Sequence, residues 1–327
     1  GISLIPAALI ASIVTLAYTW SGGILAVTLT DAVQYVIIVI GVTLCAYLAI
    51  DHLGGFDAMM SILYSNPRFE TNMKPLANWS LVQFLGLFFS FLLGEFCAPY
   101  YIQRYASTKS AKDSKNGLLI FGVHWIFFMA TTAAIGLASM AIQPDVKPDL
   151  AFTNLIRDIL PPGITGLVFG ALLAAVMSTG AAMINTSAVI YTRDIYNKFI
   201  NTAATQAQLL RQSRLSTLVV GGISIGVAII FQDVFGLMIY MFKLWPSAIL
   251  PPLMCGLLWG KISPYAGAPA VIAGGLSFFL WSDKVLGEPF GIPANFIGIG
   301  MNCLVLFFVH QKMKGHKPEG PFLPDLN

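Results

Sequence analysis

The sequence predicts an all-α, polytopic membrane protein. Of its 327 residues, 57% are hydrophobic and only 10% are charged, and the mean hydropathy is +0.77. Soluble domains carry roughly 25% charged residues, so this composition lies far outside their range. The apolar residues are also grouped into runs of about 20, the length that an α-helix needs to cross a bilayer. A soluble protein with an unusually apolar core is the alternative that both observations disfavour.

Nine such runs follow one another along the chain and predict about nine transmembrane helices. Short polar loops separate most of them. The runs predict a transmembrane bundle at 1–311, followed by a short tail, rich in proline and glycine, at 312–327. The runs cover residues 3–20, 30–50, 79–101, 117–142, 164–191, 215–232, 234–259, 265–282 and 293–311.

A longer connection at 143–163 is predicted to hold a short surface helix. Its apolar residues Ala151, Leu155 and Ile159 recur at helical spacing. The sequence Pro-Pro-Gly at 161–163 is expected to end this helix before the next span.

The basic residues predict how the spans are oriented. If the loop 103–116 is placed in the cytoplasm and the spans alternate, twelve basic residues fall on the cytoplasmic side, five fall outside, and Lys243 lies within a span. Cytoplasmic loops are enriched in Lys and Arg, so a cytoplasmic C-terminus in a cell membrane is expected. The net charge of +3 therefore reflects topology and does not indicate nucleic-acid binding.

Helix breakers occur in two predicted spans. Pro99 lies near the end of one run, and Pro246, Pro251 and Pro252 lie within another. A proline inside a helix frees a backbone carbonyl, which must find a partner in lipid. Broken helices of this kind often line transport sites, although a simple kink is the alternative.

The stretch "GALLAAVMSTGAAMINTSAVIYTRDIY" (170–196) combines an apolar helix with several polar side chains. In a helix, Ala175, Ser178 and Thr179 share one face. The Ala175 carbonyl and the two hydroxyls, met by oxygens of another helix, would suit a partly dehydrated alkali cation because such ligands replace its water shell. Alternatively, each hydroxyl bonds the carbonyl one turn back or links two helices.

Three motifs resemble those of the sodium:solute symporter family. The segment "YTWSGGILAVTLTDAVQYVIIVIG" (18–41) is similar to the family signature of Tyr-Thr, Gly-Gly, Ala-Val, Thr-Asp and Gln. Residues 174–196 resemble the family's sodium-site helix, and "YYIQRYASTKSAKDSKNG" (100–117) resembles its Gln-Arg followed by a basic loop. The motifs together span most of the chain and keep their order.

The resemblance implies a leucine-transporter-type fold, with two inverted five-helix repeats around a central site. The chain would correspond to the C-terminal part of that fold and lack the first three core helices. A sodium-coupled secondary symporter of a small organic solute, working by alternating access, is the function implied. By position, Ala175, Ser178 and Thr179 resemble the sodium ligands, and Asp31 resembles an acidic residue near the inner exit of the ion path. Asp31 would equally suit the N-terminal turn of its own span.

Glu95 and Lys243 are the candidate solute-binding residues. Both lie within apolar runs, where ionisable side chains are usually functional. Either they pair with each other or one of them meets a charged solute. Residues 96–99 replace the aromatic and amide pattern of sugar-transporting members, so an amino acid, a monocarboxylate or a quaternary amine is favoured over a sugar.

No catalytic constellation is apparent, so an enzyme is not expected. Ser224 in "GISIG" lies in the middle of a span instead of at the strand-to-helix turn that a nucleophile elbow needs. The four cysteines lack metal-ligand spacing. We expect no cofactor, Na⁺ as coupling ion, and a small solute and the lipid bilayer as partners; no oligomeric state is predicted. A transporter-like solute sensor without net transport is the alternative function.

Overall fold

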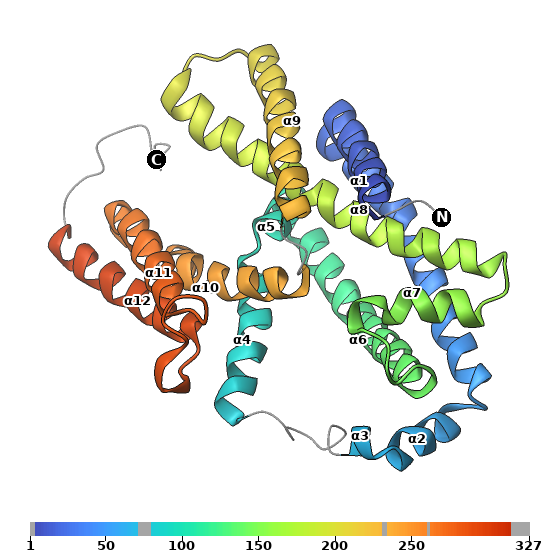
Figure 1. The fold of residues 1–327 in the computed structure, drawn as a ribbon. Coiled ribbons are helices and arrows are strands. Elements are labelled where there is room, and N and C mark those ends of the chain that lie inside the picture. The colour runs from blue at the N-terminus through green and yellow to red at the C-terminus, as the bar shows by residue number, and fades with distance from the viewer. Residues whose placement is uncertain (1–3, 71–79, 231–233, 260–261, 315–327) are drawn as a thin grey trace. The chain divides into compact units, whose positions relative to one another are not determined.

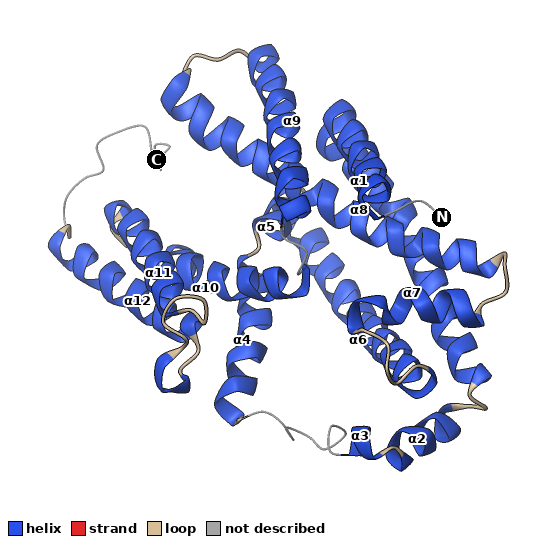
Figure 2. Ribbon diagram, viewed as in Figure 1, coloured by secondary structure: helices blue, strands red, loops and turns tan. Residues whose placement is uncertain are grey.

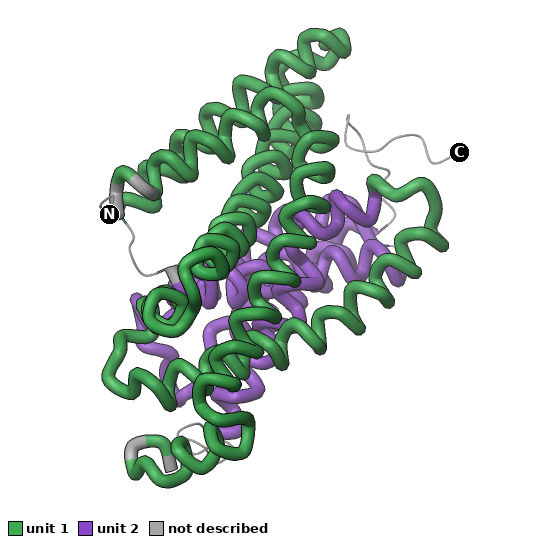
Figure 3. The backbone as a smooth tube through the Cα atoms, turned by 90° about the vertical axis from the view of Figure 1, so that its right-hand side faces the viewer, with its two compact units in different colours: residues 1–77, 107–230 green, residues 78–106, 231–327 purple. Residues whose placement is uncertain are grey.

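The computed structural model describes residues 4–70, 80–230, 234–259 and 262–314, and within these ranges the chain forms helices and loops without a strand (Figures 1 and 2). The prediction of an all-α chain is confirmed. The helices belong to two compact units, residues 1–77 with 107–230 and residues 78–106 with 231–327 (Figure 3). Most of the predicted tail, from residue 315 onward, lies outside the described residues.

The first unit is built on two long helices, α1 (Leu4–His52) and α8 (Ile164–Ile190), which pack against each other. A ten-residue π-helix, η1 (Tyr191–Ile200), continues α8. Its apolar core lies where α1 and α8 meet the shorter helices, and includes Cys45, Met59, Leu63, Ala138, Leu155, Ile156 and Val168. The other helices of this unit are α2 (Phe56–Ser65), α3 (Pro67–Glu70), α6 (Ala111–Ile142), α7 (Pro148–Ile159) and α9 (Gln206–Ile230).

The short helix predicted in the connection 143–163 is confirmed as α7. It starts at Pro148, where the missing N–H of proline costs nothing because the first turn has no acceptor for it. Leu155 and Ile156 are buried, as the apolar spacing indicates, and Leu160 ends the helix in an extended conformation just before the two prolines.

Helix α1 contains a sharp break at Gly23, whose φ of 55° and ψ of −148° are not helical. Residues on both sides of the break contact α8. The Tyr18 hydroxyl donates to the Met177 carbonyl at 3.1 Å, and Gly41 lies against Ala171. The α1 residues are 23 positions apart, about 35 Å in a straight helix, whereas Met177 and Ala171 are about 9 Å apart along α8. The two arms of α1, residues 4–22 and 24–52, therefore cannot be collinear.

Eight helices of the described chain are long and apolar enough to cross a membrane, one fewer than the nine predicted spans. The difference arises in α1, which contains the predicted runs 3–20 and 30–50 without a polar loop between them. Its two arms measure about 28 Å and about 44 Å at 1.5 Å per residue, so each is close to or above the thickness of a bilayer core. A glycine break thus replaces the expected loop.

The second unit consists of α4 (Leu81–Cys97), α5 (Pro99–Ala106), α10 (Val234–Trp259), α11 (Gly267–Trp281) and α12 (Ala294–Lys312), with two short 3₁₀ helices, η2 (Pro264–Ala266) and η3 (Pro289–Gly291). Helix α10 packs against α4, α11 and α12. A capping box opens α4, since Gln83 N–H donates to the Ser80 hydroxyl and Ser80 N–H to the Gln83 side chain.

Glycines allow the close packing in this unit at two places. A Cβ atom at Gly94 of α4 would lie 2.8 Å from the carbonyl oxygen of Phe242, and one at Gly86 would lie 2.7 Å from Pro293. The first approach brings α4 against the backbone of α10, and the second brings α4 against the residue before α12.

Candidate functional site

The predicted sodium ligands lie together on one face of α8. The Ala175 carbonyl oxygen accepts a hydrogen bond from the Ser178 hydroxyl and another from the Thr179 hydroxyl, both at 3.0 Å. These are the one-turn-back bonds that the sequence left as an alternative. Each hydroxyl donates its single hydrogen to the Ala175 carbonyl. The lone pairs of each hydroxyl oxygen take no part in that bond and are available to a cation. The three oxygens are neutral and of the hard type, and they are grouped on one face of α8.

Tyr18 links this oxygen cluster to the second arm of α1. Its hydroxyl donates to the carbonyl of Met177, the residue before Ser178, and lies within interaction range of the side chains of Gln34 and Asp31. The break at Gly23 brings the side chains of Tyr18, Asp31 and Gln34 together. Asp31 lies eight residues past Gly23, beyond the first turn in which a helix dipole acts on a carboxylate, so the capping alternative does not apply.

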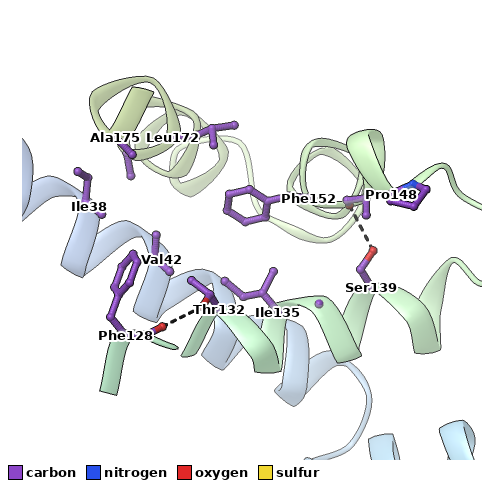
Figure 4. A pocket seen from close by; sticks show the side chains of 13 residues that line it. Ile38, Val42, Phe128, Thr132, Ile135, Ser139, Pro148, Phe152, Leu172 and Ala175 are labelled. Carbon is purple, nitrogen blue, oxygen red and sulfur yellow. Dashed lines mark hydrogen bonds between the residues drawn. The ribbon is translucent and has the colours of Figure 1, made fainter. Parts of the chain in front are cut away.

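A cavity of about 360 Å³ adjoins the cluster, with Ala175 at one end (Figure 4). Its two polar side chains are engaged, Thr132 with the Phe128 carbonyl and Ser139 with the Ala151 carbonyl. Its walls come from four helices and include Ile38 and Val42 of α1, Ile135 of α6, Phe152 of α7 and Leu172 of α8.

Glu95 lies in the last turn of α4, directly before the helix breaks. Helix α4 ends at Cys97, Ala98 is extended, and α5 begins at Pro99, so the break predicted from Pro99 is confirmed. One carboxylate oxygen of Glu95 is buried without a hydrogen-bond partner among the described residues. The carboxylate is close to the Tyr101 hydroxyl, and it forms no ion pair with a basic side chain of the described residues.

Aromatic rings surround the break between α4 and α5. Tyr100 lies 4.4 Å from Tyr101 and 6.2 Å from Trp245 of α10, measured between ring centroids. Phe242, one turn before Trp245, lies 5.0 Å from Phe91 of α4. The half-buried carboxylate of Glu95 thus lies at a helix break lined by rings from α4, α5 and α10.

Lys243 pairs with Glu288, and not with Glu95 as one of the two sequence alternatives proposed. Its ammonium lies 3.2 Å from the Glu288 carboxylate, and both side chains are about one-quarter exposed. The same oxygen of Glu288 accepts the N–H of Ala294, the first residue of α12, at 3.1 Å. No local pattern indicates this partner, because Glu288 lies in the loop between α11 and α12, 45 residues from Lys243.

The sequence matches the model of the sodium:solute symporter family over residues 1–274. The chain belongs to this family. It is therefore a multi-pass membrane protein of a transporter family and not an enzyme, as the three motifs implied.

Similar proteins include the osmoregulated proline transporter OpuE of Bacillus subtilis (strain 168), 28% identical over 290 residues, and the sodium/proline symporter of Escherichia coli (strain K12), 26% identical over 280 residues. These alignments cover 85% and 82% of this chain. The chain spans somewhat more than half of the length of these relatives, 57% and 55%.

A solved structure of a Na⁺-coupled sialic acid symporter in a substrate-bound, outward-open state superimposes with a TM-score of 0.74. The superposition covers 99% of this chain and 69% of that one, at 20% sequence identity. At this identity the likeness establishes the fold alone, and the leucine-transporter-type fold that the resemblance implied is confirmed.

Proposed function

We propose that the protein takes part in sodium-coupled symport of a small organic solute that carries a cationic amine, by alternating access. Amino acids, imino acids and quaternary amines belong to this class. The observation that carries the proposal is Glu95, a half-buried carboxylate at a helix break; one of its oxygens is buried without a hydrogen-bond partner, and it forms no ion pair with a basic side chain of the described residues. A carboxylate that has lost part of its contact with water is costly to keep charged unless a partner of opposite charge binds it.

The surroundings of Glu95 favour an amine over a monocarboxylate. Lys243 of α10 is already paired with Glu288, so it is not available to compensate the charge of an anionic solute that meets Glu95. The rings of Tyr100 and Trp245 also suit an ammonium group, because a cation is attracted to the face of an aromatic ring. Two relatives are named for proline, whose amine is cationic at neutral pH.

The oxygen cluster on α8 supports Na⁺ as the coupling ion. Ala175, Ser178 and Thr179 supply neutral oxygens, the ligand type that suits a small hard cation. If Na⁺ binding favours the conformation that binds the solute, the solute must raise the affinity for Na⁺ by the same factor. Asp31 interacts with Tyr18, whose hydroxyl contacts Met177 beside this cluster, and we propose that the Asp31 carboxylate attracts the ion.

Uptake into proteoliposomes tests the solute class. We expect transport or competition by proline and glycine betaine but not by propionate, which has a carboxylate and no amine. Glu95→Gln keeps the shape and removes the charge, and should raise the KM for the amine at least about 30-fold, because losing a buried charge partner costs about 2 kcal/mol or more. Asp158→Asn, at an exposed carboxylate of α7, is the matched control and should leave KM unchanged.

Either of two results would contradict the proposal. One is an unchanged KM in Glu95→Gln; the other is competition by propionate as strong as that by proline. Binding of the solute without counterflow across the membrane would instead support a sensor.

A further inference from the structure

The two adjacent prolines of α10 leave two carbonyl groups without their helical donors. In an α-helix each N–H donates to the carbonyl four residues earlier. Pro251 and Pro252 have no N–H, so the carbonyls of Ser247 and Ala248 lose the bonds they would otherwise accept. Ser247 is fully buried, so water cannot easily reach its carbonyl, whereas Ala248 is half-buried.

The side chain of Asn302 in α12 donates to both of these carbonyls. Its amide nitrogen lies 3.0 Å from the Ser247 oxygen and 2.7 Å from the Ala248 oxygen. An asparagine amide has two N–H groups, one for each carbonyl. Asn302 is fully buried, and its side-chain oxygen has no partner in the described chain, so the residue is used for its two donors.

Small residues of the neighbouring helices make room for this contact. A Cβ atom at Gly274 of α11 would overlap the Ser247 carbonyl oxygen and lie 2.9 Å from the Asn302 amide nitrogen. A Cβ atom at Gly298, one turn before Asn302, would lie 2.6 Å from the Ser247 Cβ atom. Larger side chains at either position would push α11 or α12 away from the proline pair.

We propose that Asn302 is a positioning residue that replaces the two backbone donors lost at Pro251 and Pro252 and so fixes the course of α10. The same helix carries Phe242 and Trp245, whose rings contact Phe91 and Tyr100 beside the break that holds Glu95. Asn302 therefore acts on the solute through α10 without touching it. This consequence for transport rests on the proposed function. The replacement of the two backbone donors by the Asn302 amide is independent of that function.

A mutant cycle on thermal stability in detergent tests the replacement itself. Alanines at 251 and 252 restore both N–H groups, so the Ser247 and Ala248 carbonyls no longer need Asn302. We expect Asn302→Ala to lower the melting temperature by several degrees in the natural background and by less than about one degree in the Pro251→Ala/Pro252→Ala background. If Asn302→Ala does not fold, the triple variant still should.

Asn295 provides the matched control for the cycle. It is an equally buried asparagine of α12, but its side chain faces the Gly86 carbonyl of α4, which no proline has freed. The effect of Asn295→Ala should be the same in both backgrounds. An equal loss of stability from Asn302→Ala in both backgrounds, or a triple variant that fails to fold, would overturn the proposal.

Solute uptake tests the positioning role. Asn302→Ala should raise the solute KM about tenfold, which corresponds to two buried hydrogen bonds between membrane helices, and the alanines at 251 and 252 should reduce that increase. A KM increase that is the same in both backgrounds would refute positioning through α10. If the stability cycle behaves as expected but uptake by the wild-type protein needs no Na⁺, the proposed function fails and the hydrogen-bond replacement stands.

Discussion

The ion pair between Lys243 and Glu288 should couple α10 to the start of α12. At 3.2 Å and an effective dielectric constant of about 20, the two charges attract by about 5 kcal/mol before desolvation is subtracted. Both groups are only about one-quarter exposed, so each has lost part of its hydration. A net coupling energy of about 2 kcal/mol between Lys243→Met and Glu288→Gln is therefore expected. Glu288→Gln keeps an oxygen for the Ala294 N–H, so the cycle isolates the charge.

Thermal unfolding of the wild type, both single variants and the double variant in detergent measures this coupling. The exposed pair Arg157 and Asp158 of α7 is the control, because solvent screens charges at such a site. A cycle with Arg157→Met and Asp158→Asn should show no measurable coupling. Additive effects of Lys243→Met and Glu288→Gln, or equal coupling in both pairs, would show that the Lys243–Glu288 charges do not couple α10 to α12.

Three further substitutions test the packing and the ion path. Gly94→Ala should destabilise the protein by about 2 kcal/mol in thermal unfolding, because the new methyl group would collide with the backbone of Phe242; unchanged stability would contradict this contact. Gly23→Ala should cost about 1–2 kcal/mol, since a side chain is strained at a φ of 55°, and a stabilised variant would show that the break is not formed. Tyr18→Phe removes the bond to the Met177 carbonyl and should raise the Na⁺ concentration for half-maximal uptake about fivefold, whereas an unaltered Na⁺ response would separate Tyr18 from the ion site.

Local sequence patterns were sufficient to predict most helices and the break at Pro99. Apolar runs define the long helices, and the spacing of Ala151, Leu155 and Ile159 predicted α7. The prediction of a polar loop after residue 20 was wrong, because the chain bends at Gly22 and Gly23 within an apolar segment. Composition has no signal for such a bend.

The hydrogen-bond and ion-pair partners of the polar groups in α10 could not be predicted from the sequence. The prolines of α10 indicate freed carbonyls, but the donor is Asn302, about 50 residues further along the chain. Glu288 is similarly distant from Lys243, and nothing in its local sequence distinguishes it from other loop acids. Such contacts depend on how α10, α11 and α12 pack, and a sequence pattern of period 3.6 carries no information on which helices meet.

Titration of Na⁺ binding to the protein carrying Ser178→Ala and Thr179→Ala tests the coupling site most directly. The apparent Kd for Na⁺ is expected to rise at least about tenfold, a loss of about 1.4 kcal/mol, since two of the ligand oxygens are lost. Ser224→Ala is the matched control, because this hydroxyl on α9 makes the same one-turn-back bond, to the Val220 carbonyl, and should leave Na⁺ binding unchanged. Wild-type affinity for Na⁺ in the double variant would show that Ser178 and Thr179 do not bind the ion.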